Sequence, residues 1–266
     1  MELFEAIKRR RSVRQYPRGT VSEEKFGKLK ECLGETRALE DGEKTDALLV
    51  ENGSDFQGSI SGVIADYGKV EAPHYLVLTA GRNKGGFIEI GYRYEFVVLE
   101  LTAMNIGTCW IGKGFSDESL EQYVNIPPGQ TCSALIAFGP LEGEAPDLIE
   151  EPKRKDPETF LLEDSIKEVD QEALELLDAL RRAPSSLNSQ PWRVLVEAGT
   201  LHLYIKSRTF ITKNLLGGLT DMNRVDAGIG LCHLKVAGEH LFGNVEVDKR
   251  RHPSRSGLEY IASLET

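Results

Sequence analysis

The sequence predicts a fold that mixes helices with strands and repeats itself in two halves of one chain. Two observations predict it. Apolar residues at helical spacing alternate along the chain with short apolar runs bounded by turn residues, which are typical of strands. The resulting order of helix, loop, strand, strand, loop, helix and strand then occurs twice. With 266 residues, the chain is long enough to bury a substantial core.

The first half begins with two helices. Leu3, Phe4 and Ile7 recur at helical spacing and predict a short amphipathic helix over residues 2–10. Ser22, followed by acidic residues, is typical of a helix N-cap and predicts a helix that continues to about Cys32. The further predicted elements are a loop at 34–46, strands at 46–52 and 74–81, a helix at 90–106, a glycine-punctuated stretch at 107–115 and a strand at 133–140.

Residues 141–160 have the composition of a linker or an arm, with acids, three prolines and a basic triplet at 153–155. A second cycle of elements follows them. Its predicted members are a helix capped by Asp170 that ends near Arg182, a loop and a strand at 183–197, a strand at 201–206, a glycine-rich helix at 226–242 and a strand at 244–250.

Short stretches of sequence also recur between the halves. GGFIEI at 85–90 parallels GGLTDM at 217–222, and the helix entered at Gly91 parallels the helix entered at Gly228. Matches of this length also arise by chance, so the shared order of elements is the stronger indication of an internal repeat. A repeat of half a chain indicates a fused dimer rather than a solenoid, with halves at 1–160 and 161–266.

The bulk composition excludes several classes of function. The formal net charge of −10 lacks the basic balance of a non-specific nucleic-acid binder, so no nucleic-acid partner is expected. No apolar run approaches the roughly 18 residues of a membrane span, and charges interrupt the N-terminal apolar pattern of a signal peptide. The four cysteines include no CxxC pair, which favours reduced, mostly buried thiols in a cytoplasmic protein. The histidines show no metal spacing, so no metal site is expected.

Three motifs together resemble the FMN-dependent nitroreductase family. They are the basic-serine motif IKRRRSVRQY at 7–16, the loop APSSLNSQPW at 183–192, which is the most specific, and the helix leading into IGTCWIG at 106–112. The resemblance covers nearly the whole chain. It implies an α+β, nitroreductase-like fold with three-layer-like halves around antiparallel-rich sheets, and FMN bound where two halves meet.

The chain departs from the family's usual arrangement of two identical subunits. The basic-serine motif occurs only in the first half, and the Pro-Ser-x-x-Asn motif occurs only in the second. A single-chain pseudo-dimer would therefore hold one complete flavin site, as in a subgroup with two fused nitroreductase-like halves. Whether the protein is monomeric or a homodimer stays open.

The resemblance assigns the FMN phosphate to Arg10, Arg11, Ser12 and Arg14. Guanidinium groups match phosphate geometry, and a charge pair at about 4 Å with an effective dielectric near 20 contributes roughly 4 kcal/mol before desolvation. The alternative is a solvated charge run at a helix end. Lys153, together with Arg154 and Lys155, lies where the family places a second set of phosphate cations; the alternative there is a solvated linker.

The resemblance also assigns Pro184, Ser185, Ser186 and Asn188 to FMN, because short polar side chains suit the edge of a flavin. The alternative is an ordinary turn after a helix. Trp192 and His233 are expected in the core.

Other groups are expected near the flavin ring. A backbone N–H of Ile111, Gly112 or Lys113 could meet flavin N5, and Arg14 could stabilise the N1–C2 region; a plain helix-to-strand turn is the alternative at 111–113. Lys69 is a further candidate for the ring.

The implied function is electron transfer from NAD(P)H, a transient donor, through bound FMN to a small acceptor such as a nitroaromatic or a quinone. No catalytic side chain is required, because the flavin carries the chemistry. No GxGxxG motif follows a strand, which is compatible with a donor that stacks on the flavin and leaves. Two alternatives remain: other flavin chemistry on the same scaffold, such as dehalogenation, dehydrogenation or flavin breakdown, and a flavin-binding protein without turnover.

Overall fold

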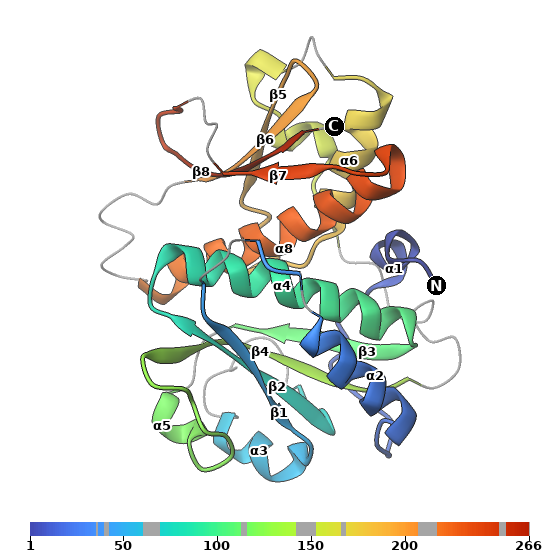
Figure 1. Cartoon of the computed structure of the whole chain (residues 1–266), viewed down its shortest axis with the longest axis vertical. Helices are drawn as coiled ribbons and strands as arrows, with labels where there is room; N and C mark the ends of the chain where they lie inside the picture. The colour runs from blue at the N-terminus through green and yellow to red at the C-terminus, as the bar shows by residue number, and fades with distance from the viewer. Residues whose placement is uncertain are drawn as a thin grey trace. The chain divides into compact units, whose positions relative to one another are not determined.

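The computed structural model describes residues 1–35, 37–39, 43–60, 70–112, 116–141, 153–165, 169–206, 217–249 and 254–265, with the backbone alone at 57–60 and 217–220. The chain divides into two compact units, Met1–Glu151 and Pro152–Thr266. Each unit has its own four-stranded sheet (Figure 1).

The first unit contains a sheet with the strand order β1-β2-β4-β3, in which every neighbouring pair is antiparallel. Three of its helices begin at side-chain caps: Ser22 Oγ accepts from the Lys25 N–H, Asn83 Oδ1 from the Gly86 N–H at 2.7 Å, and Ser116 Oγ from the Ser119 N–H at 3.2 Å. The elements are α1 (Leu3–Arg9), α2 (Glu23–Gly34), β1 (Thr45–Val50), α3 (Gly53–Ile60), β2 (His74–Gly81), α4 (Lys84–Ala103), β3 (Ile106–Ile111), α5 (Asp117–Leu120) and β4 (Gln130–Pro140).

Helices cover both faces of this sheet, which gives the unit three layers (Figure 1). On one face lies α4, which is buried along most of its length. On the other face, Phe56 of α3 and Leu120 of α5 pack with Tyr75 and Val77 of β2. Because both faces are covered, nearly every residue of β2 and β4 is buried, including the residues whose side chains alternate to opposite faces of the sheet.

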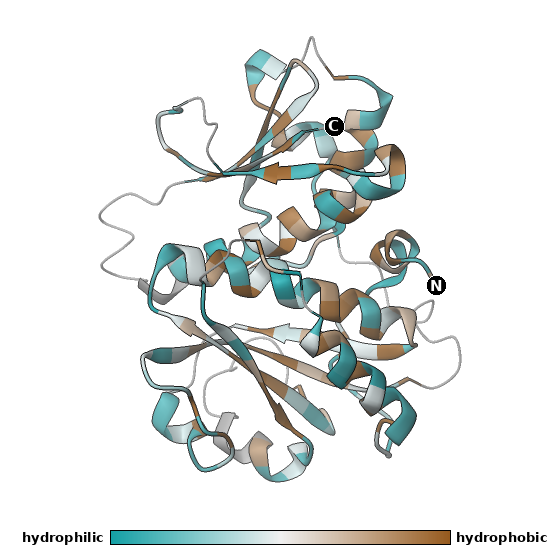
Figure 2. Ribbon diagram, in the orientation of Figure 1, coloured by the Kyte–Doolittle hydropathy of each residue, from teal (hydrophilic) through white to brown (hydrophobic). Residues whose placement is uncertain are grey.

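The helix predicted over residues 90–106 begins earlier in the structure, at Lys84. Asn83 is the reason, because its side chain caps the first turn and allows both glycines that follow to enter the helix. In Figure 2, α4 is more hydrophobic than α2, whose exposed face carries charges of both signs. This difference matches the burial of the two helices.

The second unit has a sheet with the order β5-β6-β8-β7, again antiparallel throughout. Asp170 caps α6 as predicted, since its side chain accepts from the Ala173 N–H at 2.8 Å. The elements are η2 (Pro157–Phe160), η3 (Glu163–Ser165), α6 (Gln171–Arg182), η4 (Ser186–Asn188), β5 (Trp192–Glu197), β6 (Thr200–Lys206), α8 (Gly217–Phe242), β7 (Glu246–Asp248) and β8 (Leu258–Glu265).

The two sheets repeat the same topology. In each, the first strand pairs with the second, the second with the fourth and the fourth with the third. The central pair of each sheet also has one register shift, at Leu78/Thr79 in the first and at Leu203/Tyr204 in the second. GGFIEI and GGLTDM lie at the starts of the corresponding helices α4 and α8. The α+β fold with two antiparallel sheets is confirmed, although sequence reasoning missed β8.

Residues 153–160 belong to the second unit, whereas the sequence-based division placed them in the first half. The Phe160 ring packs edge-on against Trp192 with ring centroids 5.9 Å apart, and the Leu162 N–H donates to the Val194 carbonyl at 2.8 Å. The basic triplet therefore leads into the second unit instead of following the first.

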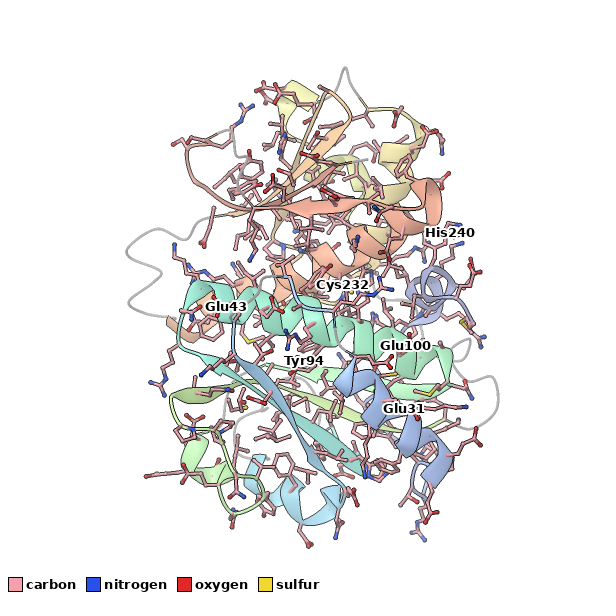
Figure 3. All side chains as sticks on the ribbon, viewed as in Figure 1. Glu31, Glu43, Tyr94, Glu100, Cys232 and His240 are labelled. Atoms are coloured by element: carbon pink, nitrogen blue, oxygen red, sulfur yellow. The ribbon has the colours of Figure 1, made fainter. Side chains whose placement is uncertain are left out.

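All four cysteines are free thiols, and three of them are buried. Cys32 of α2 is half-buried; burial raises its pKa, and so do acids that include Glu100 of α4 and Glu31 of α2, both labelled in Figure 3. Its thiolate is thus disfavoured. Among the helices in the described ranges, none has the length and apolar character needed to cross a bilayer.

Candidate functional site

In the first unit, the basic-serine motif is fixed to the edge of the sheet. After α1 ends at Arg9, the chain runs extended beside β3, where Ser12 forms a parallel bridge with Thr108 and the Val13 N–H donates to the Thr108 carbonyl at 2.8 Å. Gly107 permits this approach, because a Cβ there would lie 2.9 Å from Val13 Cγ2. The motif is therefore part of the folded sheet and not a loose charge run.

The arginines of this motif have different environments. Arg11 turns back toward α1 and donates to the carbonyls of Lys8 and Arg10, at 2.8 and 3.0 Å. Arg14 is exposed, and its Nη1 lies 3.4 Å from the Ser12 carbonyl. Of the three arginines assigned to the phosphate, Arg11 thus performs the helix-end role that the alternative interpretation gave to the whole cluster.

Arg10 is the buried cation of the motif, with 3% of its surface exposed. Burial lowers the pKa of its guanidinium, and the carboxylate of Glu95 on α4 opposes this shift. Glu95 is itself buried and accepts a hydrogen bond of 2.6 Å from the Trp110 indole N–H. Within the described residues, Arg10 Nε has no hydrogen-bond partner. A buried guanidinium nitrogen left without an acceptor is costly, which makes this position suited to an anionic ligand.

The segment predicted as a glycine-punctuated stretch at 107–115 is largely a strand. β3 continues through Trp110 to Ile111, which is buried and pairs with Leu135 of β4. The aromatic and β-branched residues of this stretch explain the strand, because they suit a pleated, buried surface. Ile111, expected in a turn, is therefore the last residue of the strand, and Gly112 follows it directly. Lys113 and Lys69 lie outside the described residues.

In the second unit, the loop after α6 has an unusual backbone. Leu187, Asn188 and Gln190 all have positive φ, at 55°, 51° and 46°. Asparagine tolerates this left-handed region, whereas leucine and glutamine adopt it at a cost of about 1–2 kcal/mol each. The Leu187 residue is also 54% exposed to solvent. Such backbone strain persists only where surrounding contacts enforce it, and it is frequent at ligand sites.

Asp226 of α8 supplies one of those contacts, and sequence reasoning missed it. Its carboxylate oxygens lie 3.0 and 3.1 Å from the Ser186 N–H, and its backbone carbonyl accepts from the Trp192 indole at 3.1 Å. Asp226 is 1% exposed. An acid directly before the apolar stretch 227–232 of α8 was the available signal. Trp192 is fully buried, as predicted, and His233 is also buried, with Nδ1 3.0 Å from the Ala179 carbonyl.

Two further side chains of this loop form hydrogen bonds, one within the loop and one to Lys155. Ser185 Oγ accepts from the Gln190 N–H at 3.0 Å, and Gln190 Oε1 accepts from the Lys155 N–H at 3.0 Å. Pro184 is buried next to Ser185. Pro184, Ser185 and Gln190 thus have structural roles in shaping the loop, whatever the loop binds.

The structure joins the basic triplet to this loop, although the sequence separates them by about 30 residues. The Asn188 side chain accepts from the Arg154 guanidinium and donates to the Lys153 carbonyl at 2.6 Å. Lys155 Nζ donates to the Ser189 carbonyl at 2.6 Å. Two segments that the resemblance assigned separately to the cofactor therefore form one substructure of the second unit. We call residues 153–155 the basic arm and residues 184–190 the polar loop.

Comparison with known proteins agrees with this description. Residues 2–238 match the family described as "Putative TM nitroreductase". Among solved structures, a "putative nitroreductase" from Thermotoga maritima is 22% identical with a TM-score of 0.66, over 99% of this chain and 93% of the other.

Shorter solved chains match part of the protein. A nitroreductase with bound FMN from Bacteroides fragilis (19% identity, TM-score 0.47) covers 58% of this chain and 95% of its own. An FMN-dependent nitroreductase from Clostridium difficile (18%, 0.45) covers 52% and 87%. No curated protein sequence matches. The match over residues 2–238, together with the fold, shows that the chain belongs to the "Putative TM nitroreductase" family.

Proposed function

We propose that this protein is an FMN-dependent oxidoreductase that passes electrons from NAD(P)H to a small acceptor such as a nitroaromatic or a quinone. Membership of the nitroreductase family supports the reaction class. The observation that carries the cofactor proposal is Arg10, a buried guanidinium whose Nε has no acceptor in the described residues. A phosphate oxygen is a strong partner for such a group, because guanidinium N–H donors match the geometry and charge of a phosphate.

Under this proposal, Arg10, Ser12 and Arg14 bind the FMN phosphate. Their backbone is held against β3, so little conformational entropy would be lost when the ligand binds. Arg14 is the exposed cation of the group and is free of carboxylate contacts in the described residues, which leaves it able to reach a ligand. Arg11 contributes by closing the end of α1.

The polar loop is proposed as the second set of FMN contacts, through Ser185, Ser186 and Asn188. Asp226 fixes the Ser186 N–H and the basic arm fixes Asn188, so the loop presents a defined conformation. The bound flavin would supply the redox chemistry, while the chain's own residues bind and orient it. This role explains why no side-chain acid or nucleophile is required. It also makes both halves of the chain necessary for one flavin.

The visible absorption spectrum of the purified protein tests the proposal. We expect flavin absorption, a stoichiometry near one FMN per chain and bleaching by NADH or NADPH, followed by reoxidation when a nitroaromatic or a quinone is added. A protein that binds no flavin after reconstitution would refute the cofactor assignment. A yellow protein that no donor bleaches would refute the oxidoreductase and favour a flavin-binding protein. A stoichiometry near two would contradict the single split site.

A further inference from the structure

Three cations of the second unit gather where β5 begins and β6 ends. Arg193 is the second residue of β5 and lies opposite Tyr204 of β6. Lys206 is two residues beyond Tyr204, so its side chain and that of Arg193 project from the same face of the sheet. The Lys206 N–H donates to the Pro191 carbonyl at 3.3 Å, which holds this end of the ladder together.

Lys155 of the basic arm reaches the same place. Its Nζ lies 2.6 Å from the Ser189 carbonyl and 3.4 Å from the Gln190 carbonyl, immediately before Pro191. Both acceptors are neutral. They fix the position of the ammonium group and leave its charge in place.

These three cations differ in their partners from several other cations of the same unit. Across the described ranges, neither Lys155, Arg193 nor Lys206 forms an ion pair with a carboxylate, and Arg193 instead donates to the Trp192 carbonyl. Burial lowers the pKa of Lys155, and the charges of Arg193 and Lys206 lower it further. By contrast, Arg181, Arg182, Arg224, Lys235 and Arg255 of the same unit all contact carboxylates.

Mutual repulsion among three neighbouring cations opposes folding, and an anion bound among them would offset it. A phosphate suits the set best, since it carries nearly two charges and several acceptor oxygens that a guanidinium and ammonium groups can share. We propose that Lys155, Arg193 and Lys206 form a phosphate-binding site. Arg193 and Lys206 are new to this role.

Two sources of phosphate fit the site if the proposed function holds: the phosphate of FMN and the 2′-phosphate of NADPH. The phosphate site itself does not depend on that function. Inorganic phosphate is therefore the first probe, titrated by calorimetry into the full chain without added flavin, at constant ionic strength maintained with chloride.

The double variant Arg193→Gln/Lys206→Gln should bind inorganic phosphate at least about tenfold more weakly than the wild type. Lys206→Gln alone, at an exposed position that should not affect folding, should lose several-fold. The matched control is Lys28→Gln/Arg181→Gln, which removes the same charge from two cations that are paired with Glu24 and Asp178. Wild-type protein that binds no phosphate, a double variant with unchanged affinity, or an equal loss in the control would each overturn the site.

Repeating the titration with FMN-loaded protein separates the two sources. If FMN abolishes phosphate binding, and the double variant loses its preference for FMN over riboflavin, the site holds the cofactor phosphate. If phosphate binding persists, and the double variant instead loses a preference for NADPH over NADH in KM, the site holds the donor phosphate. A protein that binds phosphate but never flavin would retain the site and refute the proposed function alone.

Discussion

Asn188 contributes to the link between the basic arm and the polar loop beside the contacts of Lys155, so replacing Asn188 should loosen the arm. The Asn188 side chain makes two short hydrogen bonds: the oxygen accepts from the Arg154 guanidinium, and the nitrogen donates to the Lys153 carbonyl. The oxygen also accepts a longer bond of 3.3 Å from Gln190 Nε2. Because Asn188 is exposed, each short bond should contribute near the low end of the usual net range, about 0.5–1 kcal/mol. Asn188→Ala should therefore weaken the attachment of the arm by about 1–2 kcal/mol.

Hydrogen–deuterium exchange of peptides that contain Lys155 measures this attachment, because the Lys155 N–H donates to Gln190 within the same substructure. A loss of about 1–2 kcal/mol corresponds to exchange that is faster by roughly 5- to 30-fold. Asn188→Gly should accelerate exchange equally, since it removes the same side-chain bonds. Ser189→Ala is the control, because only the backbone carbonyl of Ser189 holds the arm, and its exchange should match the wild type.

The same pair of variants separates hydrogen bonding from backbone strain. Residue 188 has a φ of 51°, which alanine adopts at a cost of about 1–2 kcal/mol and glycine adopts freely. Urea unfolding should therefore show Asn188→Ala to be the less stable of the two. Exchange at Lys155 that stays within twofold of the wild type in both variants would refute the assigned role of Asn188. Under the proposed function, both variants should also bind FMN more weakly.

Three further predictions concern the flavin, the packing and the pH dependence. Arg10→Ala/Arg14→Ala should yield colourless protein, whereas retention of stoichiometric FMN in its absorption spectrum would refute the phosphate assignment. Gly230→Ala should lower the free energy of unfolding by about 1–3 kcal/mol, because a Cβ there would lie 2.5 Å from Trp192 Nε1. Gly27→Ala in α2 has open space around it and should raise the free energy of unfolding by about 0.5–1 kcal/mol. Equal effects of the two variants in urea titrations would contradict this packing. Neutral His74 accepts from the Val21 N–H through Nε2 at 3.1 Å, and burial lowers the pKa of its imidazole. Its contribution to the free energy of unfolding is therefore complete above about pH 6.5, and it is lost as the pH falls through the lowered pKa of the folded state. The free energy of unfolding should thus decrease from pH 7.5 to pH 5, and it should decrease less steeply in His74→Gln. His202 should cause part of the slope that remains, because burial lowers its pKa too. An unchanged slope in His74→Gln would show that His74 does not cause the pH dependence.

Local patterns in the sequence were sufficient for most elements of the fold. Ser22 and Asp170 marked helix starts that the structure confirms, because an N-cap acts within its own turn. The strands at 74–81 and 201–206 were predicted from runs of apolar residues whose burial is nearly complete. Three short motifs, of which the one at 183–192 is the most specific, likewise indicated the family. Each of these signals is contained in a short window of residues.

Tertiary contacts decided the rest. Asp226 is 40 residues from the Ser186 N–H that it holds, and Asn188 is 34 residues from Arg154. No short window contains either pair. The resemblance assigned Arg10, Arg11 and Arg14 together to the FMN phosphate, whereas the sheet edge buries Arg10 and leaves Arg14 exposed. Periodicity and capping report interactions within a few residues, but burial and side-chain partners depend on which distant segments the fold brings together.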